Sequence, residues 1–263
     1  MKRNNFYLLL TGALLLTIAA CNKGQDNFFS KEDIIPVSVK GYNASDEPLE
    51  VKLDTCSFKY PFASNSIMDQ LNAYTFRENQ AQMKLMIKEQ NSGKVVLERD
   101  IQRKAGAIRL NFLYTKGKVI DIPEKQPIQD KKLTISYFFM PTLTNYADPV
   151  DIVLIKYYFT PKVFEEIVRI KNVKPYEFST PVTIPTFSTS GQKYNGQNTA
   201  VLFRAYIYKA GTNEFYTAAA GYNWHPTAST APTPVASVAS SAIYIFSEDE
   251  SDPNITFTKI LEQ

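Results

Sequence analysis

Alternation between apolar and polar side chains recurs along most of the chain, and it is the strongest constraint on what the chain can fold into. In residues 81–88, Met83, Leu85 and Ile87 alternate with mostly polar neighbours. Residues 90–93, Gln-Asn-Ser-Gly, then supply turn chemistry before a second β-prone arm over 95–101. Such a pair predicts a β-hairpin. Comparable β-prone runs occupy residues 37–42, 108–114, 118–122, 132–140, 150–159, 200–209, 214–218, 242–247 and 255–260.

Short strands separated by Gly- and Pro-containing turns are typical of β-sandwiches. We therefore predict an all-β chain with two β-sandwich domains of immunoglobulin-like or transthyretin-like type. Three prolines in a Ser/Thr-rich stretch after residue 172 place the boundary there, with an amino-terminal sandwich over 34–172 and a smaller carboxy-terminal β-domain over 173–263. A single large sandwich is the alternative. Two short helices are expected over 66–74 and 161–170, and an exposed loop over 226–242.

Composition excludes several classes of protein. Of the 263 residues, 44% are hydrophobic, which is enough to form a core and too much for a disordered chain. The net charge of +3 argues against a nucleic-acid partner. A single His and two Cys exclude a metal site rich in either residue.

The amino terminus has the features of an export signal. Lys2 and Arg3 precede an apolar run over residues 6–20, which is too short to cross a bilayer as a helix. The run ends in Ile-Ala-Ala-Cys, with the cysteine at position 21. This ending resembles the lipobox of bacterial lipoproteins. The resemblance implies that residues 1–20 are a cleaved signal peptide and that Cys21 becomes the lipidated first residue of the mature chain.

Lipidation implies a membrane as one partner, because several acyl chains hold a protein stably on a bilayer. Residues 21–33 are expected to be the lipidated tether. Asn22 stands where an aspartate would signal retention in the inner membrane, so we expect an outer-membrane anchor, on the periplasmic face or the cell surface. In layout, the chain resembles uncharacterised β-sandwich surface lipoproteins of Bacteroidota. Cys56 is then the remaining free thiol, and it is expected to be buried among apolar side chains.

Two segments are candidate sites. Tyr222, Asn223, Trp224 and His225 combine the sole Trp and the sole His with a second aromatic ring and an amide, which suits a glycan or a protein ligand. The same aromatic rings are also suited to packing in a core. The acidic segment 248–254 is expected to be a solvated turn. If it binds Ca²⁺, the ligands are Glu248, Asp249, Asp252 and Asn254; no other cofactor is expected.

No set of residues for acid–base, nucleophilic or metal chemistry is evident, so we do not expect an enzyme. Glu165 and Glu166 are adjacent on a predicted helix and point to different sides, as solvated residues do. The sequence therefore predicts a non-catalytic, lipid-anchored binding protein of the cell envelope, with a glycan or peptide ligand or an accessory role in outer-membrane uptake. The alternative is a fimbrial or adhesive lipoprotein that engages a partner by strand addition.

Overall fold

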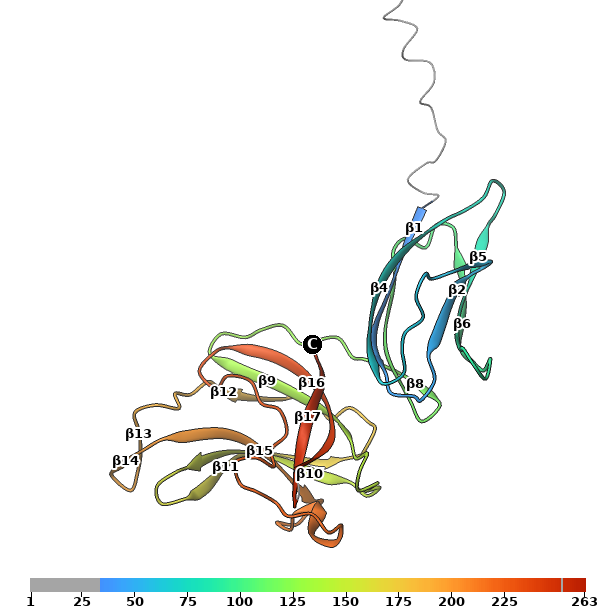
Figure 1. Cartoon of the computed structure of the whole chain (residues 1–263). Coiled ribbons are helices and arrows are strands. Elements are labelled where there is room, and N and C mark those ends of the chain that lie inside the picture. The colour runs from blue at the N-terminus through green and yellow to red at the C-terminus, as the bar shows by residue number, and fades with distance from the viewer. Residues whose placement is uncertain (1–33, 252) are drawn as a thin grey trace, which may run out of the picture. The chain divides into compact units, whose positions relative to one another are not determined.

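The computed structural model describes residues 34–251 and 253–263 (Figure 1), and these residues confirm the all-β prediction. The first eight strands are β1 (Ile34–Asn43), β2 (Leu49–Leu53), β3 (Cys56–Ser57), β4 (Ser66–Thr75), β5 (Gln82–Glu89), β6 (Val95–Gln102), β7 (Ile108–Thr115) and β8 (Lys118–Asp121). The later elements are β9 (Lys132–Met140), β10 (Val150–Tyr158), β11 (Val163–Val173), β12 (Val182–Pro185), β13 (Gln192–Tyr194), β14 (Gln197–Thr199), β15 (Val201–Lys209), the 3-10 helix η2 (Tyr216–Ala219), β16 (Ser240–Ser251) and β17 (Asn254–Glu262). The predicted signal peptide, Cys21 and the tether lie outside the described residues.

The strands that come first in the sequence follow the predicted alternation. In β5, Met83, Leu85 and Ile87 are buried, whereas Gln82 and Lys84 are exposed. Successive side chains of a strand point to opposite faces, so this pattern turns one face of the sheet toward a core. Two four-stranded sheets result, with strand orders β4-β1-β7-β8 and β3-β2-β5-β6.

One glycine in β1 is required by a close backbone approach. Gly41 has a φ of +131°, and a Cβ added there would lie 1.7 Å from the backbone oxygen of Phe112. A side chain at this position would therefore overlap β7 as well as strain its own backbone.

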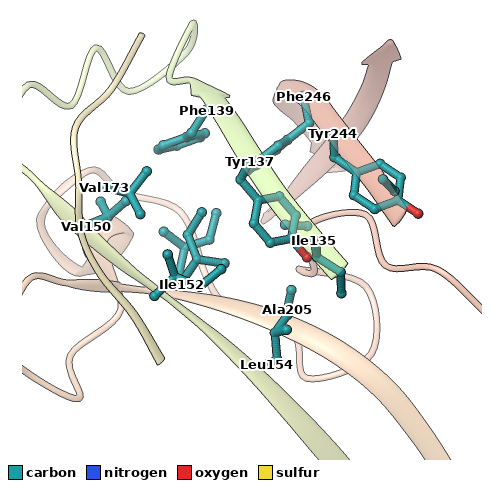
Figure 2. Close-up of a cluster of buried hydrophobic side chains, with 14 of the residues drawn as sticks. Ile135, Tyr137, Phe139, Val150, Ile152, Leu154, Val173, Ala205, Tyr244 and Phe246 are labelled. Atoms are coloured by element: carbon teal, nitrogen blue, oxygen red, sulfur yellow. The ribbon is translucent and has the colours of Figure 1, made fainter. Parts of the chain in front are cut away.

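The later strands form two further sheets, with strand orders β12-β9-β16-β17 and β11-β10-β15. β9 and β16 run parallel, from Leu133 opposite Ser240 to Met140 opposite Ser247, and the other pairs in these two sheets are antiparallel. The main core lies between the two sheets. Figure 2 shows its central side chains, among them Ile135, Tyr137, Phe139, Val150, Ile152, Leu154, Ala205, Tyr244 and Phe246.

The predicted boundary at residue 172 is wrong. Strands that precede it, β9 and β10, pair with β12, β16 and β15, which follow it, so a cut there would divide both later sheets. The chain does divide into two compact units, but along other lines. The larger unit comprises Gly41–Asp46, Phe62–Met68 and Asn111–Gln263, and the smaller unit comprises the other described residues up to Leu110.

Both predicted helices are strands. Residues 66–74 belong to β4, and residues 163–170 belong to β11, so Glu165 and Glu166 lie on a strand. Apolar residues spaced by three or four fit either periodicity in a short segment, and tertiary pairing then decides. The predicted return arm over 214–218 instead enters η2, after one bridge between Tyr208 and Phe215.

Candidate functional site

An open groove with a volume of about 640 Å³ lies in the larger unit, between the segment 230–238 and the strands β16 and β17. This volume falls in the range of ordinary ligand sites, roughly 300–1,000 Å³. We call it the Tyr244 groove. Its lining residues are Lys125, Ile128, Thr230, Pro232, Thr233, Pro234, Val235, Val238, Ser240, Ser241, Ala242, Tyr244, Phe257, Lys259 and Glu262.

The floor of the groove is aromatic and continuous with the core. The ring of Tyr244 is 2% exposed and stacks on Tyr137 with a centroid distance of 5.9 Å. Phe257 is half-buried and meets Phe246 edge-on at 5.7 Å. Because these rings are held by core packing, the floor is rigid before any ligand arrives.

The walls of the groove carry apolar side chains that are open to solvent. Ile128 is 62% exposed, Val235 is 67% exposed and Val238 is 55% exposed. Isolated apolar residues on a surface are ordinary, but several around one hollow mark a surface that contacts another molecule. Pro232 and Pro234 extend the same wall.

The lining of the groove also includes polar residues. The Lys259 ammonium is paired with Glu262 at 2.5 Å and lies 5.9 Å from the centre of the Tyr244 ring. Burial, followed by the negative charge and hydrogen bond of Glu262, raises the pKa of Tyr244 above its ordinary value. Tyr244 therefore keeps its proton at neutral pH. The Ser240 hydroxyl is buried without a hydrogen-bond partner among the described residues, which leaves one polar group for a ligand or water to satisfy.

The segment predicted as an exposed loop over 226–242 is a loop up to residue 239, where β16 follows, but it is exposed only in part. Ser229, Ala231 and Ala236 are buried, and the Ala231 amide donates to the backbone oxygen of Ala205 at 3.0 Å. Small side chains allow this segment to pack closely along β15. The Tyr137 hydroxyl also donates to the backbone oxygen of Pro232 at 2.9 Å, which fixes the groove wall to the core.

Trp224 does not line the groove and is half-buried among other rings. Phe215 stacks on it at 4.4 Å with an interplanar angle of 7°, Tyr206 meets it edge-on at 5.6 Å, and Phe257 lies 5.8 Å away. Phe215 therefore covers one face of the indole, so Trp224 is not the open stacking platform that the sequence suggested. Packing in the core, the role that the sequence also allowed for this ring, agrees with these contacts, but the buried indole nitrogen has no hydrogen-bond partner among the described residues, and ligand binding at Trp224 stays a prediction.

The other three predicted ligand residues hold the segment 221–229 in place. The Tyr222 hydroxyl donates to Glu250 at 3.3 Å. The Asn223 amide donates to the backbone oxygen of Pro253, just before β17, and the Asn223 oxygen accepts from the Ile255 amide in β17. The Nδ1 atom of His225 accepts hydrogen bonds from the Thr227 and Ala228 amides at 3.3 and 3.2 Å. Ligand binding at Tyr222, Asn223 and His225 stays a prediction.

Glu248 is not a solvated residue of an acidic turn, because it lies in β16 and is 5% exposed. Its Oε2 accepts from the Leu143 and Thr144 amides, both at 2.7 Å. Its Oε1 accepts from the Thr144 hydroxyl at 2.5 Å and the Tyr216 hydroxyl at 2.7 Å. Both oxygens are thus occupied by protein donors, which removes Glu248 from the predicted calcium ligands.

The remaining acidic candidates are not brought together. Asp249 follows Glu248 on the opposite face of β16, is exposed, and accepts from the Thr258 hydroxyl at 2.8 Å. Asn254 is opposite Ser251 in the hairpin, and Asp252 lies outside the described residues. Within residues 34–251 and 253–263, no group of three or more His, Cys, Asp or Glu side chains is placed to hold a metal ion.

Two other findings bear on the candidates. Cys56 is exposed, contrary to the expectation that it is buried, because it lies on the two-residue strand β3 at a sheet edge. In the part of the chain that the structure describes, no helix is both long and apolar enough to cross a membrane.

The groove residues were missed by sequence reasoning. Tyr244 and Phe257 were expected only as members of strands, and Val235 and Val238 only as part of an exposed loop. No local signal distinguishes them, because the groove forms where a loop meets two strands.

Comparisons with known proteins give little guidance. No family model matches the chain, and no curated protein matches it. Among solved structures, one similar chain is described as a putative cell adhesion protein from Bacteroides ovatus ATCC 8483. It is 9% identical, the match covers 87% of this chain and 96% of that one, and the TM-score is 0.17. At that score the likeness supports no conclusion about this chain.

Proposed function

We propose that the chain is a non-catalytic, lipid-anchored protein of the cell envelope that binds an extended apolar segment of a partner protein in the Tyr244 groove. The observation that carries the proposal is the exposure of Ile128, Val235 and Val238 around one hollow with a rigid aromatic floor. The lipid anchor and the outer-membrane location rest on the sequence around Cys21 alone.

The groove suits a peptide better than a glycan. Sugar faces stack on open aromatic rings, but Tyr244 is 2% exposed and one face of Trp224 is covered by Phe215. The accessible walls are aliphatic, and aliphatic surfaces gain free energy by burying apolar side chains of a ligand. Such binding without chemistry is also compatible with an accessory role in uptake. The adhesive alternative depends on a sheet edge, which is a different surface.

The test is selection of peptides from a phage-displayed random library on the immobilised protein, followed by affinity measurement by calorimetry. We expect enrichment of peptides with apolar residues, and at least a tenfold loss of affinity in Val235→Lys and Val238→Lys. Losing the burial of one valine is worth about 1.5–3 kcal/mol, which corresponds to roughly tenfold or more.

The matched control is Val95→Lys, because Val95 is also an exposed valine, at 49%, but lies on β6. It should bind the selected peptides as the unaltered protein does. The proposal fails if no peptide is enriched, or if Val95→Lys weakens binding as much as the groove variants. Binding on a glycan array that is lost in Val235→Lys would assign the groove to sugars instead.

A further inference from the structure

β4 differs from the other strands that end a described sheet. It is ten residues long and stands at the end of the order β4-β1-β7-β8, with β1 as its sole strand neighbour among the described residues. Its sequence, SIMDQLNAYT, contains no Pro, Gly, Lys or Arg and a single charge, at Asp69. An edge strand of this kind presents unpaired backbone groups over roughly 33 Å at 3.3 Å per residue.

The other described edges carry the features that discourage pairing. Five of them, β3, β8, β12, β13 and β14, have two to four residues, and β12 ends in proline. β6, β11 and β17 each have a register shift in their ladder and carry several charged side chains. The free edge of β15 is covered by the segment around Ala231. β4 is thus the long edge that no second strand covers in the described structure, and the preceding segment contacts it through the Gln70 side chain, which donates to the Tyr60 backbone oxygen at 3.0 Å.

The outward face of β4 is also apolar. Met68 and Tyr74 point to the core and are 1% and 7% exposed, whereas Ile67 and Leu71 on the other face are 57% and 71% exposed. Asp69, on the same outward face, is paired with Lys40 of β1 at 3.4 Å. The strand therefore offers backbone groups and two large apolar side chains, and its one charge has a partner.

We propose that β4 pairs antiparallel with β4 of a second copy of this chain, about a twofold axis at Leu71. A twofold interface requires a surface that is complementary to itself. In an antiparallel pair, residues directly opposite each other have their side chains on the same side of the sheet. The twofold axis must therefore lie between a residue and the same residue of the second copy, and each register is defined by that central residue. Two registers pair the largest number of residues, nine of the ten in β4, with β4 of the second copy. One is centred on Gln70 and the other on Leu71.

The side chains distinguish these two registers. Centring on Gln70 places the Asp69 carboxylate of each copy opposite the apolar Leu71 of the other. Centring on Leu71 places the two Leu71 side chains together, Asp69 opposite Ala73, and Ile67 opposite Thr75. The second register joins apolar groups and opposes no like charges, which is the pattern that stabilises strand pairs.

The test measures the oligomeric state of the purified mature protein, with Cys21 and Cys56 replaced by Ser, by sedimentation equilibrium. We expect a dimer that dissociates on dilution, with at least tenfold weaker association in Leu71→Lys and in Ile67→Lys. Both positions are exposed, so the charge should leave folding intact. Val235→Lys, in the Tyr244 groove, is the matched control and should dimerise normally.

Cross-linking tests the register. In the same background, Leu71→Cys should oxidise to a disulfide-linked dimer, because residues directly opposite have Cβ atoms about 5 Å apart. Ile67→Cys should not, because residue 67 and its copy are eight residues apart along the ladder, roughly 26 Å. The double variant Ile67→Cys with Thr75→Cys should cross-link again.

Three results would overturn the proposal. They are a protein that stays monomeric at its highest soluble concentration, a dimer that survives Leu71→Lys, and cross-linking of Ile67→Cys without cross-linking of Leu71→Cys. A monomer whose β4 binds a strand-forming peptide of another sequence would assign this edge to a different partner. Peptide binding in the groove is measured separately, so either idea can fail without the other.

Discussion

Replacing Glu248 by alanine should strongly destabilise the larger unit. The substitution leaves the Leu143 and Thr144 amides and the Thr144 and Tyr216 hydroxyls without their common acceptor. A buried donor that loses its partner costs about 1–3 kcal/mol. Water entering the vacated space satisfies part of this demand, so we expect a loss of about 3–5 kcal/mol in the free energy of unfolding, a large part of the 5–15 kcal/mol typical of a folded domain.

Glu248→Gln refines the prediction because it keeps the volume of the side chain. Its carbonyl oxygen still accepts hydrogen bonds, but its amide group faces two donors. We therefore expect a smaller loss, about 2–3 kcal/mol. Asp249→Ala is the matched control: it removes the neighbouring carboxylate, which is exposed, and should cost less than about 1 kcal/mol.

The assay is urea unfolding followed by the fluorescence of Trp224, the single tryptophan, which lies in the same unit as Glu248. Linear extrapolation gives the free energy of unfolding in water. Our interpretation of Glu248 would be refuted if Glu248→Ala lost less than about 1 kcal/mol, or no more than Asp249→Ala. A rise in the unfolding midpoint on adding Ca²⁺ that depends on Glu248 would restore it as a metal ligand.

Three further predictions concern other parts of the chain. Gly41→Ala should lower the free energy of unfolding by about 3 kcal/mol or more, because its Cβ would overlap the Phe112 backbone. Its urea midpoint should therefore be lower than that of the unaltered protein, and an unchanged midpoint would contradict this. Burial, with a hydrogen bond to Glu165, raises the pKa of Tyr158 to about 12, so the stability from its neutral hydroxyl is complete below pH 10 and is lost as the pH rises from 10 to 12. Urea midpoints measured across this range should fall less in Tyr158→Phe, and an equal fall in both proteins would count against the role of the hydroxyl. Cells fed an alkyne fatty acid should label the protein, and Cys21→Ala should abolish the label; labelling that persists would disprove lipidation at Cys21.

Interactions between residues that are close in the sequence determine much of the secondary structure of the chain. In β5 and β9 the predicted strands agree with the observed ones to within a residue, because alternation and turn residues act over a few positions. The same local rule failed over 66–74 and 163–170, where apolar spacing is compatible with helix or strand.

What the sequence alone determined, then, is the strand-rich character of the chain and an amino-terminal pattern that predicts export. Only the tertiary structure decided that β9 pairs with β16, whose partner residues are 107 positions apart, as Leu133 and Ser240 show. It also decided that Glu248 is buried, that small residues over 226–239 form a groove wall, and that β4 is left at an edge. The physical reason is that alternation depends on adjacent residues, whereas burial and pairing depend on contacts between segments far apart in the chain, which no local pattern specifies.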